Sequence, residues 1–180
     1  MEQKTALITG ASRGIGAATA RRLARAGYAV AVNYCSSEER ALALVEELRA
    51  EGHTAMAVRA DVSDPEQVRT MVDNVLDKFC QLDILVCNAG RSWVGLLGDM
   101  TVAEWRELFS VNLDSVFYCC KAVLPHMIHR KKGKIITVSS MWGQVGASCE
   151  AAYSASKAGV IGLTKALAKE LGPSGIAVNC

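Results

Sequence analysis

The sequence predicts an α/β protein in which a doubly wound parallel sheet carries helices on both faces. Short apolar runs alternate with segments of helical periodicity along the whole chain, and this alternation is typical of parallel sheets. A glycine-rich turn follows the first apolar run. The chain has 180 residues, of which 51% are hydrophobic, and contains no linker, long repeat or low-complexity segment. We therefore expect a single domain over residues 1–180.

The first expected strand and helix enclose a glycine loop. The apolar run Thr5–Thr9 predicts a buried strand, and Ala17–Ala26 has helical periodicity and ends before Gly27. Between them lies GASRGIG, residues 10–16, with the spacing G-x-x-x-G-x-G. A strand, a glycine loop and a helix in this order present backbone N–H groups to a phosphate. The arrangement predicts nucleotide binding in a Rossmann fold.

The second strand, Tyr28–Tyr34, bears on the choice of cofactor. A site for NAD places Asp or Glu about 20 residues past the glycine loop, where the carboxylate binds the ribose 2′-hydroxyl. Here residues 33–36 read Asn-Tyr-Cys-Ser, and no acid occurs before Glu38. A carboxylate would repel a 2′-phosphate, so its absence, with Arg13 and the Ser36 hydroxyl nearby, favours NADP(H). The alternative for Arg13 is a solvated loop residue.

The next elements continue the alternation. Ser36-x-x-Glu39 has the pattern of a capping box and would open a helix that ends at Gly52. Residues 54–60 predict a third strand. Asp61 and Val62 follow that strand and are candidates to flank an adenine, although Asp61 also suits a turn cap. After Asp64-Pro65 a helix begins, and its apolar face comprises Val68, Met71, Val72, Val75, Leu76 and Phe79.

The fourth strand, residues 82–87, reads LDILVC without alternation, as buried parallel strands do. It ends at Asn88-Ala89-Gly90. Small residues there let the backbone approach a ligand, and an ordinary tight turn is the alternative.

The longest helical region begins at the capping box Thr101-x-x-Glu104 and runs to about Arg130, with an interruption expected at Pro125. Asn112 lies within it between apolar neighbours. A buried amide of this kind either satisfies a neighbouring backbone or marks a site. The remaining expected elements are a strand at 134–139, a helix at 153–171 and a strand at 176–180.

Tyr153 and Lys157 stand four residues apart in an alanine-rich segment, a spacing that puts both side chains on one helix face. An ammonium near a phenol lowers the phenol pKa from about 10, and the positive end of a helix dipole acts in the same direction. Ser140 follows a strand and is placed to hydrogen-bond the oxygen that Tyr153 would protonate. Each feature alone has an ordinary explanation, because Tyr and Lys share helix faces by chance and a serine after a strand is usually a turn or cap residue.

Composition argues against several other classes of function. The net charge of +2 gives no reason to expect nucleic acid or an anionic membrane, and no apolar run reaches the roughly 20 residues of a membrane-spanning helix. Seven cysteines without C-x-x-C spacing indicate reduced core thiols in a cytoplasmic protein. His126 and His129 share a helix face without an acidic or cysteine partner, so we expect no metal site.

The motifs TGASRGIG at 9–16, CNAG at 87–90 and YSASK at 153–157, with Asn112 and Ser140, occur together in one chain. Over its whole length the chain resembles the classical short-chain dehydrogenases/reductases, and the glycine loop and VNY segment are most similar to the bacterial 3-oxoacyl-[acyl-carrier-protein] reductases. The resemblance implies reduction of a carbonyl to an alcohol by hydride from NADPH.

The resemblance also implies roles for particular residues. Asn112 would support a proton-relay water, Ser140 would orient the substrate carbonyl and Tyr153 would protonate it. Lys157 would bind the nicotinamide ribose and lower the Tyr153 pKa. The expected cofactor contacts also include the end of the second strand and the residues just after it. In full they are Gly10, Ser12, Arg13, Gly14, Ile15, Gly16, Asn33, Tyr34, Ser36, Asp61, Val62, Asn88, Ala89, Gly90, Tyr153 and Lys157.

The sequence departs from the family pattern at Cys87, which replaces the first asparagine of NNAG, and at the bulky Trp93 and Trp142 near the expected substrate pocket. We expect a 3-oxoacyl thioester of fatty acid synthesis as substrate. The alternatives are another ketone, such as a steroid, a sugar or acetoacetyl-CoA, and a non-catalytic NADP-binding module.

Small residues at 155, 158, 159 and 162 permit close helix approach and favour a homo-oligomer, for which the resemblance implies a tetramer. The alternative is that they pack only against the protein's own sheet. The family pattern continues past the final VNC with a substrate lid and a seventh strand, both of which this chain lacks. Because a chain that stops in an apolar strand exposes an unpaired edge, we expect a longer polypeptide.

Overall fold

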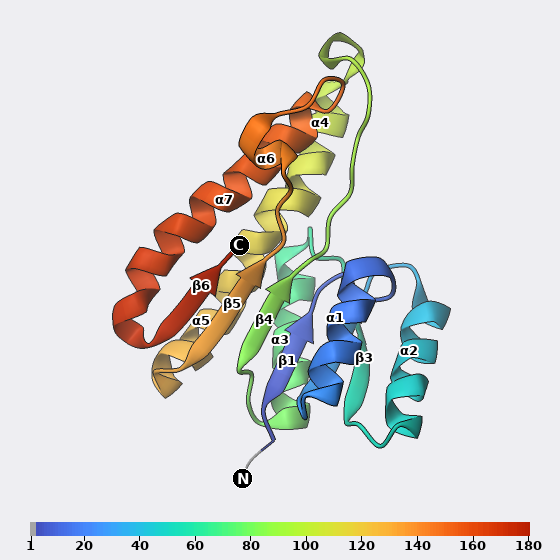
Figure 1. The fold of residues 1–180 in the computed structure, drawn as a ribbon, viewed down its shortest axis with the longest axis vertical. Helices are drawn as coiled ribbons and strands as arrows, with labels where there is room; N and C mark the ends of the chain where they lie inside the picture. The colour runs from blue at the N-terminus through green and yellow to red at the C-terminus, as the bar shows by residue number, and fades with distance from the viewer. Residues whose placement is uncertain (1–2) are drawn as a thin grey trace.

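The computed structural model describes residues 3–180 and contains one six-stranded sheet in the order β3-β2-β1-β4-β5-β6 (Figure 1). Every neighbouring pair is parallel. The strands are β1 (Thr5–Ile8), β2 (Ala29–Tyr34), β3 (Ala55–Arg59), β4 (Ile84–Cys87), β5 (Gly133–Thr137) and β6 (Ile176–Asn179). All six expected strands are confirmed.

Helices connect the strands and lie on both faces of the sheet. The α-helices are α1 (Gly14–Arg25), α2 (Glu38–Ala50), α3 (Pro65–Phe79), α4 (Val102–Phe109), α5 (Ser115–Arg130), α6 (Trp142–Val145) and α7 (Ala151–Leu171). Shorter turns are η1 (Leu97–Asp99), the π-helical η2 (Ser110–Asp114) and η3 (Gly172–Ser174). The short helix α6 was not predicted from the sequence.

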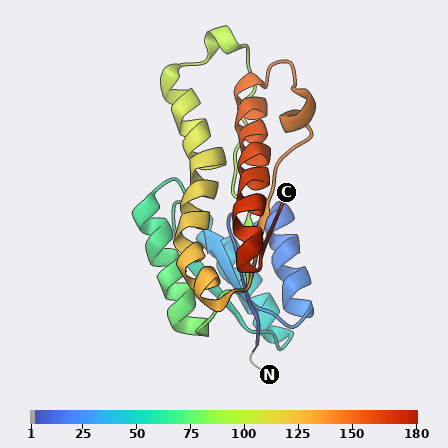
Figure 2. The same cartoon turned by 90° about the vertical axis from the view of Figure 1, so that its left-hand side faces the viewer.

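Two apolar cores hold the layers together. Side chains such as Leu7, Leu85 and Ile135 point from the sheet toward α3, α5 and α7, whereas Ile8 and Val32 point toward α1 and α2 on the opposite face. Figure 2 shows α1 on one side of the sheet and α3 and α5 on the other. Each fully buried leucine or isoleucine contributes about 1.5–3 kcal/mol. The predicted doubly wound architecture is confirmed.

The order of the strands defines where a ligand would bind. From β1 the chain proceeds outward to β2 and β3, and it then returns to place β4 on the other side of β1. In open α/β sheets the crevice at the carboxyl ends of the strands, where the order reverses, is the binding site. Here that point lies between the ends of β1 and β4.

Of the three helix starts predicted from a capping box or an Asp-Pro pair, two are confirmed. The Asp64 side chain accepts hydrogen bonds from the backbone N–H groups of Glu66 and Gln67 at 2.9 and 3.3 Å, and Pro65 is the first residue of α3. At α4, Thr101 and Glu104 form the reciprocal capping box. Side-chain caps of this kind stabilise a helix by about 1 kcal/mol.

The capping box predicted at Ser36 is wrong. Helix α2 begins at Glu38 with Ser37 as its N-cap, and no side chain caps it. The Tyr34 hydroxyl donates a hydrogen bond to Glu38 Oε1 at 2.8 Å, which fixes the entry to the helix by another route. With Ser37 as the N-cap, Glu39 is the second residue of the helix, whereas a capping box requires the glutamate at the third.

The interruption predicted at Pro125 is also wrong. Helix α5 runs through Pro125 without a break, because this residue is exposed and water can solvate the carbonyl that proline leaves without a donor. The helical region is interrupted instead by the π-turn η2, at Ser110–Asp114. Such turns occur frequently at functional sites, and Asn112 lies in this one.

The expectation that the cysteines are core residues is confirmed for Cys87, Cys119 and Cys120 but not for the other four, which are exposed: Cys35, Cys80, Cys149 and Cys180. Cys80 and Cys149 adopt positive φ angles of 61°, so these two lie in turns rather than in packed elements. All seven are free thiols. Within residues 3–180 no helix is long and apolar enough to cross a bilayer.

Candidate active site

The glycine loop after β1 requires glycine because two backbone segments approach each other there. Gly10 has φ +60°, and a Cβ on it would lie 2.9 Å from the Ala89 Cα atom. A Cβ on Gly16 would lie 2.6 Å from Asn88 Nδ2 and 2.7 Å from the Gly10 carbonyl oxygen. Real Cβ atoms do not come this close to their neighbours, so the loop depends on both glycines.

The side-chain amides of Asn33 and Asn88 hydrogen-bond the backbone of the glycine loop. Asn33 is 1% exposed; its Oδ1 accepts from the Gly10 N–H at 3.1 Å, and its Nδ2 donates to the Val58 and Ala60 carbonyls. Asn88 Nδ2 donates to the Thr9 and Gly10 carbonyls at 2.9 and 3.1 Å. The amide of Asn33 is therefore used to support the loop.

A cavity of about 570 Å³ opens over this loop, within the usual size range for ligand pockets. The expected cofactor residues that line it are Gly10, Ser12, Arg13, Gly14, Ile15, Asn33, Tyr34, Ser36, Asp61, Val62, Asn88, Ala89 and Gly90. Seven further residues line it that were not predicted from the sequence: Cys35, Ser37, Ala60, Ser63, Arg91, Glu107 and Val111. Gly16, Tyr153 and Lys157 do not line this cavity.

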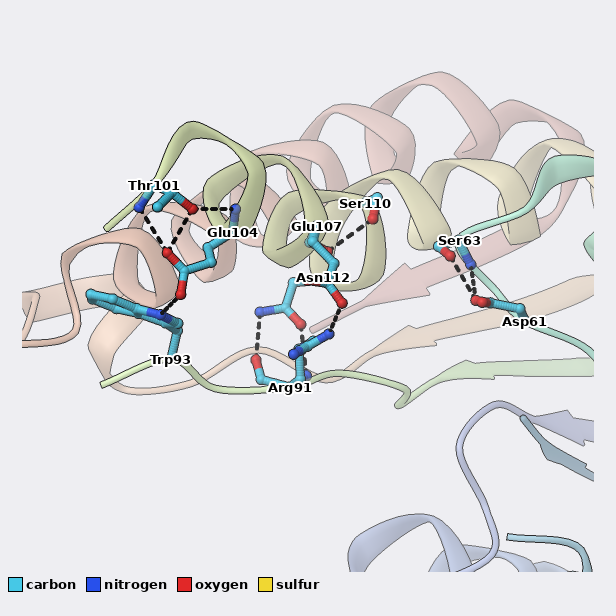
Figure 3. A network of polar contacts seen from close by, with 9 residues as sticks. All are labelled: Asp61, Ser63, Arg91, Trp93, Thr101, Glu104, Glu107, Ser110 and Asn112. Atoms are coloured by element: carbon cyan, nitrogen blue, oxygen red, sulfur yellow. Dashed lines mark hydrogen bonds and ion pairs between the residues drawn. The ribbon is translucent and has the colours of Figure 1, made fainter. Parts of the chain in front are cut away.

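Two polar residues that line the cavity, Tyr34 and Asp61, already form hydrogen bonds within the protein. The hydrogen bond from Tyr34 to Glu38 raises the Tyr34 pKa, and burial acts in the same direction. Asp61 Oδ1 accepts from the N–H and hydroxyl of Ser63 at 2.9 and 2.7 Å, as Figure 3 shows. Asp61 therefore caps a turn and also lines the cavity, so its two interpretations are compatible.

Tyr153 and Lys157 lie on adjacent turns at the start of α7, which begins at Ala151. The Lys157 Nζ atom lies 5.9 Å from the centroid of the Tyr153 ring and donates to the Val138 carbonyl at 2.9 Å. Lys157 is only 5% exposed, and this burial lowers its pKa below the usual value. A buried cation with one carbonyl partner is thus held beside the phenol.

Asn112, in the π-turn η2, lies near the Lys157 ammonium. It is fully buried, its Oδ1 accepts from the Arg91 N–H at 2.9 Å and its Nδ2 donates to the Arg91 carbonyl at 2.9 Å (Figure 3). A Cβ on Gly90 would lie 3.2 Å from Asn112 Oδ1 and 3.3 Å from Lys157 Nζ. Asn112, Lys157 and the turn after β4 therefore converge at Gly90.

Ser140 lies in the turn between β5 and α6. Its Oγ accepts from the Trp142 N–H at 3.2 Å. The same turn is anchored to α7, because the Ser139 hydroxyl donates to the Lys157 carbonyl at 2.8 Å. A Cβ on Gly143 would lie 2.7 Å from the carbonyl carbon of Lys157, so only glycine permits this approach. The turn that carries Ser140 thus lies directly against the helix that carries Tyr153.

Each of these features supports one kind of chemistry. Two glycines shape a loop at the switch point of a parallel sheet, and a phenol, a buried ammonium and a buried amide lie at the carboxyl ends of the central strands. A loop of this kind suits the phosphates of a dinucleotide, and a phenol beside a cation suits proton transfer. The fold and site define a dinucleotide-dependent oxidoreductase.

Comparison with known proteins specifies the family. The family model described as short chain dehydrogenase matches residues 4–180, and this chain belongs to that family. It is 48% identical to 3-oxoacyl-[acyl-carrier-protein] reductase FabG of Staphylococcus aureus (strain Mu50 / ATCC 700699) over 176 residues, 98% of this chain and 72% of the relative. It is 47% identical to the 3-oxoacyl-[acyl-carrier-protein] reductase of Synechocystis sp., over 98% of this chain and 71% of the relative.

A solved structure gives the same result for the fold. The crystal structure of a variant of actinorhodin polyketide ketoreductase with NADPH matches with a TM-score of 0.95 and 38% identity, over 98% of this chain and 68% of that one. The expected resemblance and the expected enzyme class are confirmed: the chain is a carbonyl-reducing oxidoreductase of the short-chain dehydrogenase type that uses a nicotinamide cofactor.

Proposed function

We propose that this protein uses NADPH to reduce the 3-oxo group of an acyl thioester to a hydroxyl, as a 3-oxoacyl-[acyl-carrier-protein] reductase of fatty acid synthesis. The observation that carries the reaction is the convergence of Lys157 and Asn112 at Gly90, beside Tyr153. The similarity to the two bacterial reductases supports the substrate class. The similar ketoreductase crystallised with NADPH supports the cofactor.

The cleft would accommodate a dinucleotide, because a cavity of about 570 Å³ opens directly over the glycine loop and no side chain projects from Gly10 or Gly14 into it. NADPH bound there supplies the hydride. The loop residues Gly10, Ser12 and Gly14 would hold its phosphates through backbone and hydroxyl groups, and Arg13, which is exposed at the rim, would pair with the 2′-phosphate. Along the chain, the first acid after residues 33–36 is Glu38, which already accepts a hydrogen bond from Tyr34.

The chain's own groups would handle the proton. Tyr153 gives its hydroxyl proton to the carbonyl oxygen, which Ser140 orients through a hydrogen bond. The ammonium of Lys157, 5.9 Å from the ring centroid, stabilises the negative charge that the phenol oxygen then carries. Asn112 holds the turn at Arg91 in place and supports the water that returns a proton to the site.

The test is NADPH oxidation by the protein with acetoacetyl thioesters, ketosteroids and sugars as substrates. Highest turnover on the thioester of acyl carrier protein supports the proposal. Highest turnover on a steroid, a sugar or acetoacetyl-CoA would assign the site to another ketone. NADPH binding without turnover of any substrate would indicate a non-catalytic binding module.

We also propose that the protein acts as a homotetramer in the cytoplasm. Ala155, Ala158 and Gly162 are exposed on α7, and a Cβ on Gly162 would meet nothing within 4 Å. Gly159, in contrast, is packed against Leu113 of the protein itself. Small exposed residues along a helix favour close approach of a second helix. The free thiols fit a reducing compartment.

A further inference from the structure

Ser156 connects the parts of the candidate site, and the mechanism above gives it no role. It lies in α7 between Tyr153 and Lys157 and is fully buried. Its hydroxyl donates to the Tyr153 carbonyl at 2.8 Å, and its Oγ accepts from Asn112 Nδ2 at 3.1 Å. One hydroxyl thereby joins the helix of the Tyr–Lys pair to the π-turn.

The single proton of this hydroxyl determines how Asn112 is oriented. Because the proton is donated to the Tyr153 carbonyl, Ser156 presents only lone pairs to Asn112. The NH₂ end of the amide therefore faces Ser156 and the Arg91 carbonyl, and the oxygen faces the Arg91 N–H. A reversed amide would place its oxygen against two acceptors and its NH₂ against a donor, and leaving such buried groups unpaired costs about 1–3 kcal/mol each.

The orientation of this amide affects the cation of the site. A Cβ on Gly90 would contact both Asn112 Oδ1 and Lys157 Nζ, so the amide oxygen and the ammonium face the same small volume. Oxygen there favours the charged form of Lys157, whereas an NH₂ group would oppose it. We propose that Ser156 is a positioning residue that fixes the Asn112 amide and, through it, the charge of Lys157 during turnover. As far as turnover is concerned, this inference rests on the proposed function.

The test compares Ser156→Ala with Thr164→Val. Thr164 is also buried on α7 and hydrogen-bonded, to Thr137 at 2.7 Å and to the Val160 carbonyl at 2.7 Å, so its replacement controls for the general loss of a buried hydroxyl. The first measurement is hydrogen exchange of the Asn112 side-chain amide by NMR, with the signal assigned by its absence in Asn112→Ala. Exchange should accelerate at least about tenfold in Ser156→Ala, as expected for one lost hydrogen bond, and stay unchanged in Thr164→Val.

The second measurement is the pH dependence of kcat. In Ser156→Ala the basic limb of the kcat profile should move to lower pH by about one unit, the equivalent of one lost hydrogen bond. In an Asn112→Ala background, Ser156→Ala should have no further effect, since residues that act through one another are not additive. The control variant should keep the wild-type pH profile.

Unchanged amide exchange, or a pH profile that matches wild type while stability falls, would overturn the proposal and leave Ser156 with a structural role only. Full additivity with Asn112→Ala would also overturn it. If wild type reduces none of the substrates, the proposed function fails, and the exchange measurement still decides whether Ser156 positions Asn112.

Discussion

Tyr153 is the residue on which the proposed reaction depends most directly. It lies in the first turn of α7 with the Lys157 ammonium over its ring. Tyr153→Phe removes one hydroxyl and should leave the fold and NADPH binding intact, because no hydrogen bond from that hydroxyl holds the described structure together. We expect kcat to fall about 10²–10⁴-fold, the usual loss for a general acid.

The measurement for Tyr153→Phe is turnover together with NADPH titration by fluorescence. Unchanged NADPH affinity shows that the variant is folded. A kcat within tenfold of wild type would remove Tyr153 from the role of proton donor.

Arg13 should determine the choice between the two nicotinamide cofactors. It is exposed at the rim of the cleft, where residues 33–36 provide no carboxylate. Arg13→Ala should lower kcat/KM for NADPH by one to two orders of magnitude, since a charge-assisted hydrogen bond contributes about 1.5–3 kcal/mol, and should leave kcat/KM for NADH nearly unchanged. Arg22→Ala, an exposed arginine further along α1, is the matched control. A wild-type preference for NADH would contradict the prediction.

Residue motifs that are local in sequence could be predicted, and contacts between distant segments could not. The glycine loop and the Tyr153–Lys157 pair have fixed spacings within one turn or helix. Asn112, in contrast, binds Ser156 across 44 residues and Arg91 across 21. Its polarity in an apolar setting marked it as a candidate, but nothing in the sequence identified those partners. Arg91 and Glu107, which line the cleft as an ion pair, follow no recognisable pattern.

Among the helices and turns, too, the features set by a few consecutive residues were predicted and the others were not. The helix start at Asp64-Pro65 and the capping box at Thr101 were predicted because they depend on two to four consecutive residues. The π-turn η2 was not predicted, because its one extra residue displaces the apolar pattern by a single position, and the short helical segments on either side do not define that pattern sharply enough to reveal the shift. The helix break predicted at Pro125 was wrong for a related reason. Whether proline breaks a helix depends on the exposure of the backbone around it, and the local sequence does not specify that exposure.

Helix α5 also contains a group that should make stability depend on pH. His126 Nε2 accepts the backbone N–H of Leu82 at 3.1 Å, and burial, followed by the nearby Arg130, lowers the pKa of His126 below its usual value of 6.5. Because the unfolded state binds this proton more readily, the contribution of His126 is fully present above about pH 6.5 and decreases as pH falls toward the folded pKa.

Urea unfolding of wild type and His126→Gln at about pH 5 and about pH 8 tests this. The free energy of unfolding of wild type should drop more between the two pH values than that of His126→Gln. His129→Gln, at an exposed position of the same helix, should behave as wild type does. An equal drop in wild type and His126→Gln would show that His126 does not couple folding to protonation.

At the scale of the whole molecule, the parallel sheet and the helices on both of its faces follow from the alternation of apolar runs and helical segments. Parallel strands need crossover connections, and the right-handed crossover rule leaves few arrangements. The glycine loop after β1 then selects the one with the cleft between β1 and β4. The surface is harder to derive, because exposed small or apolar residues on a helix look alike in sequence whether they meet the protein's own sheet or a second copy.

The exposed small residues of α7 provide the last prediction. Ala155, Ala158 and Gly162 are exposed on α7, and a Cβ on Gly162 would meet nothing within 4 Å. Exposed Phe117 on α5 adds apolar area of the kind that interfaces bury. Light scattering of the wild-type protein at micromolar concentration should give the mass of a tetramer. Ala158→Arg places a long cation at the proposed contact and should shift the mass to a smaller species. Ala43→Arg, at an exposed position of α2 on the other face of the sheet, should leave the mass unchanged. A wild-type monomer would reject the assembly, and a tetramer unaffected by Ala158→Arg would move the interface away from α7.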